Sequence, residues 1–114
     1  MVDQGEGIPC IVIEVVKEPR NGKAGLGFSI GGGIDQDPAK NPIAPNDNGI
    51  FVTNIQPGGP AERAGLRYGD KILEANGLDL TMATHKHAVK LLSKERDPRV
   101  LMKVTRPGLV PPQQ

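Results

Sequence analysis

Short runs of apolar and β-branched residues follow one another along the chain, and glycine, proline or asparagine separates most of them. Runs of this length that are bounded by turn residues are typical of β-strands. We therefore predict five strands, at residues 10–16, 26–30, 49–55, 71–76 and 100–105. A sixth, very short strand at residues 78–80 is left open.

Two helices are predicted within this series of strands. Thr84 is a natural N-cap, and behind it apolar residues recur at helical spacing as far as about Ser93, before an Asp-Pro pair. A shorter helix is predicted over residues 60–65, which open with a proline suited to the first helical position and close on a glycine. The expected fold class is therefore α+β, mainly β with two helices.

The stretch from residue 33 to residue 48 separates the second and third predicted strands. It carries three prolines and few apolar side chains, and it is longer than most connections without regular structure. The sequence leaves two interpretations open, a mobile loop and a binding loop.

The composition fits one folded domain. A length of 114 residues suits a single core, and 37% hydrophobic residues with only 3% aromatic ones mean that aliphatic side chains must fill that core. The polar, Gly-rich residues 1–9 and the proline-rich residues 107–114 are expected to be flexible tails of a domain at residues 10–106. We expect this domain to be a monomer.

Charge and cysteine usage exclude several function classes. A formal net charge of +1 with interspersed signs gives no basic surface, so nucleic acid is not an expected partner. Cys10 is the only cysteine, which excludes an intramolecular disulfide, and neither a signal-peptide pattern nor a bilayer-length apolar run is present. We expect a cytoplasmic protein, with the nucleus and the inner face of the plasma membrane as further locations.

The segment Gly25-Leu-Gly-Phe28 precedes a predicted strand and combines two useful properties. Its glycines let the backbone take unusual dihedral angles, so that consecutive N–H groups can converge on one anion such as a carboxylate. Leu26, Phe28 and Ile30 fall on one face by period-two alternation and form an apolar floor beside that anion site. The pattern therefore predicts a receptor for the end of a polypeptide chain.

A series of short motifs in this order resembles the PDZ family over residues 10–106. The motifs are Gly25-Leu-Gly-Phe28, Gly49-Ile-Phe-Val52, Gly58-Gly-Pro-Ala61, Ala64-Gly-Leu66, Gly69-Asp-Lys-Ile72, Asn76-Gly77 and His85. The segment 27–38 further resembles the group of small single-PDZ proteins known as Tax-interacting or glutaminase-interacting proteins. The resemblance implies a partly open β-sandwich or barrel of five to six strands, capped by two helices.

The same resemblance implies a function in protein–protein interaction. PDZ domains bind the free C-terminal tails of other proteins, which add as an antiparallel strand beside the second predicted strand. Tails of the Ser/Thr-x-hydrophobic class are expected. By resemblance, the partners include channels, catenin-type proteins of Wnt signalling and metabolic enzymes such as glutaminase, and a protein of this size would compete with PDZ scaffolds.

Site residues follow from matching these motifs position by position. The resemblance implies carboxylate binding by the amides of Leu26, Gly27 and Phe28, with help from Arg20 or Lys23. Here Asn21 stands where many relatives carry a basic residue, so the identity of the helper is open. The pocket for the last side chain would be lined by Leu26, Phe28, Ile30, Val89 and Leu92; His85 would select Ser or Thr; and Ser29 and Thr53 would contact the intervening side chains.

Other interpretations of these residues are weaker. The spacing of Cys10, His85 and His87 fits no metal signature, and nothing marks Cys10 as an activated nucleophile, so no enzyme, metal site or cofactor is expected. A membrane-peripheral or structural role is the alternative function. It would use the basic residues of the last helix to meet anionic lipid, namely Lys86, Lys90, Lys94 and Arg96.

Overall fold

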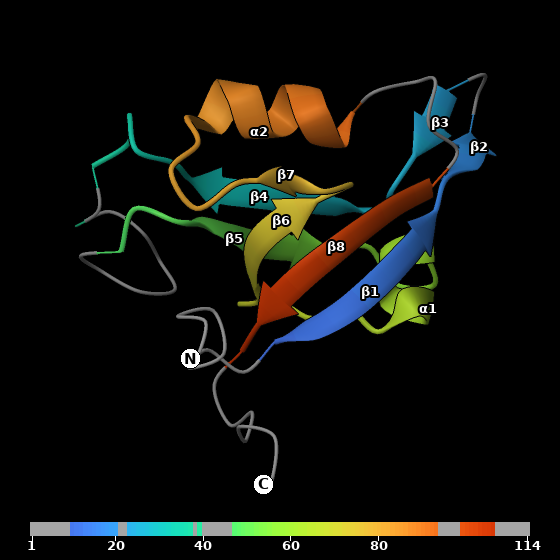
Figure 1. The fold of residues 1–114 in the computed structure, drawn as a ribbon. Coiled ribbons are helices and arrows are strands. Elements are labelled where there is room, and N and C mark those ends of the chain that lie inside the picture. The colour runs from blue at the N-terminus through green and yellow to red at the C-terminus, as the bar shows by residue number, and fades with distance from the viewer. Residues whose placement is uncertain (1–9, 21–22, 38, 40–46, 94–98, 107–114) are drawn as a thin grey trace, which may run out of the picture.

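The computed structural model describes residues 10–20, 23–37, 39, 47–93 and 99–106. These residues form strands and two helices that follow one another along the chain (Figure 1). In chain order they are β1 (Ile11–Val16), β2 (Glu18–Arg20), β3 (Lys23–Gly25), β4 (Phe28–Gly32), β5 (Ile50–Ile55), α1 (Pro60–Ala64), β6 (Lys71–Ala75), β7 (Leu78–Asp79), α2 (His85–Leu92) and β8 (Arg99–Thr105).

Six of the strands form one antiparallel sheet in the order β1-β8-β6-β5-β4, with β7 paired to β6. β2 and β3 form a separate two-stranded sheet. Figure 1 shows α2 alongside β4, at one end of this order, and α1 near β1 at the other. The open sheet with two helices confirms the predicted fold class, and it leaves β4 as an edge strand next to a helix.

Alternating burial along β1 and β8 shows why these segments are strands. Ile13 and Val15 of β1 are buried while their neighbours are exposed, and β8 alternates in the same way. A strand directs successive side chains to opposite faces, so this sequence pattern places one apolar face on the core. The core is aliphatic, as the composition predicts, and includes Ile13, Val15, Ile50, Val52, Ile72, Leu80, Leu92, Val100, Met102 and Val104.

Both helices begin and end close to the predicted positions. α1 has Pro60 at its first position and ends at Gly65, whose φ of 100° is the left-handed conformation that favours glycine. α2 is capped by Thr84, whose side chain accepts a hydrogen bond from the N–H of His87. Within the described residues, neither helix is long and apolar enough to cross a membrane.

The prediction was wrong at two places around the glycine segment. No strand was predicted between residues 16 and 26, but Glu18–Arg20 and Lys23–Gly25 pair as the short strands β2 and β3. These strands carry no apolar alternation, so their backbone pairing leaves no hydrophobic pattern to detect. The next strand begins at Phe28 rather than at Leu26, because Gly27 takes a left-handed φ of 83°.

The start of the long stretch 33–48 is held against the rest of the domain. Ile34 donates its N–H to the carbonyl of Ala83 at 2.9 Å, directly before α2, and Gln36 donates to the carbonyl of Gly33 at 3.1 Å. The start of the stretch is therefore a turn that is hydrogen-bonded to the residues before α2. Residues 38 and 40–46 lie outside the described residues, as do the predicted tails 1–9 and 107–114, so the predicted domain limits stay a prediction.

Candidate functional site

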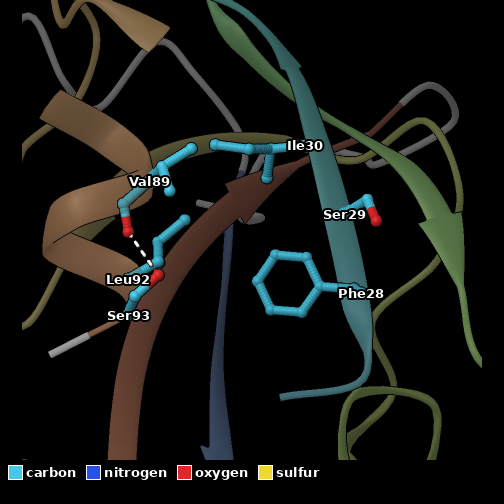
Figure 2. Close-up of a pocket in the computed structure, with 6 residues that line it drawn as sticks. All are labelled: Phe28, Ser29, Ile30, Val89, Leu92 and Ser93. Carbon is cyan, nitrogen blue, oxygen red and sulfur yellow. Dashed lines mark hydrogen bonds between the residues drawn. The ribbon is translucent and has the colours of Figure 1, made fainter. Parts of the chain in front are cut away.

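An apolar cavity of about 260 Å³ lies between β4 and α2. Figure 2 shows the side chains of Phe28 and Ile30 projecting from β4 toward α2, where Val89 and Leu92 face them. Four of the five residues predicted for a hydrophobic pocket therefore meet in one cavity. Its lining consists of Phe28, Ser29, Ile30, Val89, Leu92 and Ser93.

The helix side of the cavity consists of one buried and one partly exposed residue of α2. Leu92 is only 4% exposed and packs within the hydrophobic core, whereas Val89 is 40% exposed at the mouth of the cavity. The two residues are three positions apart and so share one face of α2. An open apolar surface of this shape can take one aliphatic side chain from another molecule.

The strand side of the cavity offers unpaired backbone groups. β4 pairs with β5 along one side, from Phe28 opposite Ile55 to Gly32 opposite Ile50, and no other described strand pairs with it. In an antiparallel strand, alternate N–H and C=O groups point to opposite sides. The side of β4 that faces α2 can therefore form hydrogen bonds with an added strand.

The glycine segment before β4 is oriented by hydrogen bonds from the residues around α1. The N–H of Ala61 donates to the carbonyl of Leu26 at 3.0 Å, and the N–H of Gln56 donates to the carbonyl of Gly27 at 2.9 Å. In a trans peptide the N–H points opposite to the carbonyl of the same unit. The N–H groups of Gly27 and Phe28 therefore point away from Ala61 and Gln56, as an anion-binding segment requires.

Glycine at position 27 is needed for this arrangement. Its φ is +83°, and a Cβ there would lie 3.1 Å from Cδ of Pro60 at the start of α1. Both the backbone conformation and the close packing on Pro60 disfavour a larger residue. The candidate anion-binding segment is thus fixed against α1.

His85, at the first position of α2, is held from two directions. Its Nδ1 lies 3.0 Å from the carbonyl oxygen of Gly32, at the end of β4, and its backbone N–H donates to Oδ1 of Asp35 at 2.9 Å. A carbonyl oxygen only accepts, so this hydrogen bond places the ring proton on Nδ1. In the neutral imidazole Nε2 is then an acceptor, which suits a hydroxyl donor.

Asp35 helps to fix the distance between β4 and α2. The N–H of His85 donates to its carboxylate and holds the pKa of Asp35 below its ordinary value, so the group is ionised at neutral pH. Gly33 lies directly against the same helix start, where a Cβ would come within 2.4 Å of the His85 nitrogen. The two sides of the cavity are therefore joined at the His85 end.

The remaining predicted site residues lie in different places. Leu26 packs partly buried against the core and does not line the cavity, and Thr53 lies beside Gly31 on the neighbouring strand. Ser29 is exposed and points away from α2 (Figure 2). It also borders a second cavity, of about 390 Å³, which is lined by Gly27, Phe28, Ser29, Asn54, Ile55, Gln56 and Pro57.

The basic residues considered in the sequence are only partly described. Arg20 and Lys23 belong to β2 and β3 and pair through their backbones, but their side chains lie outside what the structure describes. Lys86 and Lys90 are exposed on α2. Two further basic residues of the alternative membrane interpretation, Lys94 and Arg96, lie outside the described residues.

Several residues of this region were not predicted, among them Ser93 and Asn54. Ser93 lines the cavity, and its place four residues after Val89 was the available signal. Asn54 lies opposite Ser29 in the register of β4 and β5, which the sequence alone did not give. Among the described residues, no group of three or more His, Cys, Asp or Glu side chains is placed to hold a metal ion.

Comparison with known proteins places this chain in a family. The model of the PDZ domain matches residues 9–105. Human Tax1-binding protein 3 is 48% identical over 109 residues, which cover 92% of this chain and 88% of that protein, and the Caenorhabditis elegans homolog is 46% identical over 99 residues, 81% and 80% of the two chains. The crystal structure of TIP-1 wild type is 50% identical, with a TM-score of 0.81 over 85% of this chain and 86% of that one.

Proposed function

Because the chain belongs to the PDZ domain family, a family of protein-interaction modules and not of enzymes, we propose that it binds free C-terminal tails of the Ser/Thr-x-hydrophobic class. The observation that carries this proposal is the apolar cavity beside the unpaired side of β4. A tail that adds antiparallel to β4 runs toward Gly27 and ends there. Its last side chain then enters the cavity between Phe28 and Val89.

The terminal carboxylate is assigned to the glycine segment. The N–H groups of Gly27 and Phe28 point away from the residues that bind the neighbouring carbonyls, and they can donate to an anion at the end of the groove. Hydrogen bonds to a charged acceptor contribute about 1.5 to 3 kcal/mol each. Burial of one aliphatic side chain contributes a similar amount.

These contributions suit a reversible complex. Ordering a flexible tail opposes them, which leaves on the order of 8 kcal/mol, or a micromolar dissociation constant. The chain spans 88% of human Tax1-binding protein 3, so that relative is little longer than one such module. A protein of this kind acts in the cytoplasm by occupying tails and keeping multi-domain scaffolds away from them.

The proposal is tested by binding of labelled peptides that end in Thr-x-Leu, once as the free acid and once as the C-terminal amide. We expect the amide to bind about tenfold more weakly or worse, because the charged acceptor is lost. Fluorescence anisotropy measures both dissociation constants.

A variant in the cavity provides the control. Val89→Lys places a charged amine at the mouth of the cavity and should weaken every tail, and its partial exposure makes unfolding a smaller concern than at the buried Leu92. Equal affinity for acid and amide would contradict the proposal.

His85 is expected to set the preference for Ser or Thr two residues before the end of the tail. Its Nε2 accepts a hydrogen bond from the hydroxyl of the tail. His85→Ala should therefore reduce the preference for Thr over Val at that position by about tenfold, which corresponds to the free energy of one hydrogen bond. Isothermal titration with the two peptides measures this ratio. His87→Ala, on an exposed residue of the same helix, should leave the ratio unchanged; a similar change in both variants would assign the preference elsewhere.

A further inference from the structure

Ser93 lies at the end of α2 with its side chain at the cavity. It is exposed, and its hydroxyl donates to the carbonyl oxygen of Val89 at 2.6 Å (Figure 2). It lines the cavity together with Phe28, the residue whose N–H is assigned to the carboxylate of the tail. A charge on this hydroxyl would therefore stand next to the bound end of a tail.

The sequence around Ser93 also distinguishes it from the other hydroxyl residues. Lys90 stands three positions before Ser93, and it is exposed on α2. None of the other Ser or Thr residues of the chain has Lys or Arg at that spacing. A basic residue three positions before the acceptor is a determinant that many Ser/Thr kinases read through acidic side chains of their own.

We propose that Ser93 is a phosphorylation site and that a phosphate there closes the groove to C-terminal tails. This inference rests on the proposed function, and it assigns a regulation to the same groove. The reaction requires a kinase with basic-residue preference and ATP. The γ-phosphoryl group passes to Oγ of Ser93: the Oγ–P bond forms, the bond from the γ-phosphorus to ADP breaks, and the hydroxyl proton leaves to the kinase base.

The phosphate acts first on the helix. An esterified Oγ can no longer donate to the Val89 carbonyl, so the last turn of α2 loses that hydrogen bond. A negative charge at the C-terminal end of a helix also opposes the helix dipole. Both effects loosen the segment that carries Val89 and Leu92, the helix side of the cavity.

The phosphate acts second on the tail. It carries about 1.5 to 2 negative charges at neutral pH, at a position that lines the cavity. This charge repels the carboxylate of the tail across one small cavity, and dissolved salt screens the repulsion. We expect tail affinity to fall about tenfold or more, and the fall to become smaller at high salt.

The test uses the full chain, incubated with ATP and a Ser/Thr kinase that prefers a basic residue three positions before the acceptor. Mass spectrometry of the digested product should place one phosphate on Ser93, and anisotropy with a Thr-x-Leu peptide should show the weaker binding at low salt. Ser93→Ala lacks the same hydrogen bond but adds no charge, so it is the reference for the charge effect, and Ser93→Glu should bind more weakly than Ser93→Ala. Circular dichroism checks that both variants keep the fold.

Two results would overturn the inference. The first is that the phosphorylated chain, or the Ser93→Glu variant, binds the Thr-x-Leu peptide as tightly as the Ser93→Ala variant does. The second is that the kinase phosphorylates Ser93 in the unfolded chain but leaves the folded chain unmodified. A failure of the proposed function is distinguishable, because it would appear in the unmodified chain as equal binding of acid and amide peptides. The phosphate must change binding relative to that unmodified chain.

Discussion

Replacement of Arg106 by alanine is expected to lower the free energy of unfolding by about 3 to 5 kcal/mol. The reason is Asp70, which is 1% exposed and accepts hydrogen bonds from Nη2 of Arg106 at 2.7 Å and from the backbone N–H of Arg67 at 2.9 Å. Arg106 also donates to the carbonyl of Gly65 at 3.1 Å. Without the guanidinium, the buried Asp70 side chain loses the cation that contacts it. Urea unfolding at neutral pH measures the loss.

An exposed ion pair provides the matched control for Arg106. Arg99 contacts Glu14 at 3.2 Å, but both side chains are largely in solvent, so Arg99→Ala should cost about 1 kcal/mol at most. A second variant, Asp70→Asn combined with Arg106→Ala, should recover part of the stability because the buried charge is gone. If Arg106→Ala lowered the free energy of unfolding no more than Arg99→Ala does, the buried charge of Asp70 would be stabilised by a group other than Arg106.

The Arg106 contact also bears on where the folded unit ends. The family model matches as far as residue 105, yet the side chain of the next residue neutralises a buried acid. A truncated chain that ends at residue 105 should therefore lose about as much stability as the alanine variant. The contact shows that the folded unit includes Arg106, and the limit predicted at residue 106 stays a prediction.

Replacement of Gly33 by alanine is expected to destabilise the domain by about 3 kcal/mol and to weaken tail binding as well. Its φ is +123°, and the added Cβ would lie 2.4 Å from the His85 nitrogen, which is backbone and cannot rotate away. The start of α2 must then move away from β4, which breaks the hydrogen bond between Asp35 and His85. Urea unfolding and peptide titration measure the two effects.

Another glycine separates steric overlap from backbone strain. Gly77 has a φ of +80°, but nothing lies within 4 Å of an added Cβ. Gly77→Ala should therefore show only the cost of a left-handed residue, about 1 to 2 kcal/mol, with tail binding unchanged. Equal effects of the two substitutions on binding would show that contact between Gly33 and α2 does not set the groove.

Most of the fold could be predicted because its signals are local. Alternation in residues 10–16 and 100–105 marks the strand face that packs on the core. The proline and glycine around α1 and Thr84 before α2 reflect local preferences of the backbone. β2 and β3 could not be found in this way. Their pairing is satisfied by backbone groups alone, and no buried face marks it.

The site residues likewise divide into those with a local signal in the sequence and those that only the fold brings together. Alternation predicted that Phe28 and Ile30 share a strand face, whereas Val89 and Leu92, which share a helix face, were assigned to the pocket by the family resemblance. The hydrogen bond from His85 to Asp35 joins residues 50 positions apart, and only the folded chain brings them together. Leu26 has its carbonyl bound by the N–H of Ala61 and its side chain packed on the core, and its predicted role in tail binding stays a prediction.

The hydrogen bond between the His85 ring and the Gly32 carbonyl also limits how much foreign chain the domain can accept. An exposed sheet edge is a template on which unrelated chains can stack and aggregate. Here the carbonyl of Gly32, at the end of β4, is already occupied by the His85 ring, and β4 is only five residues long. A visiting strand therefore finds only a few successive partners, enough for the last residues of a tail but too few to seed a fibril.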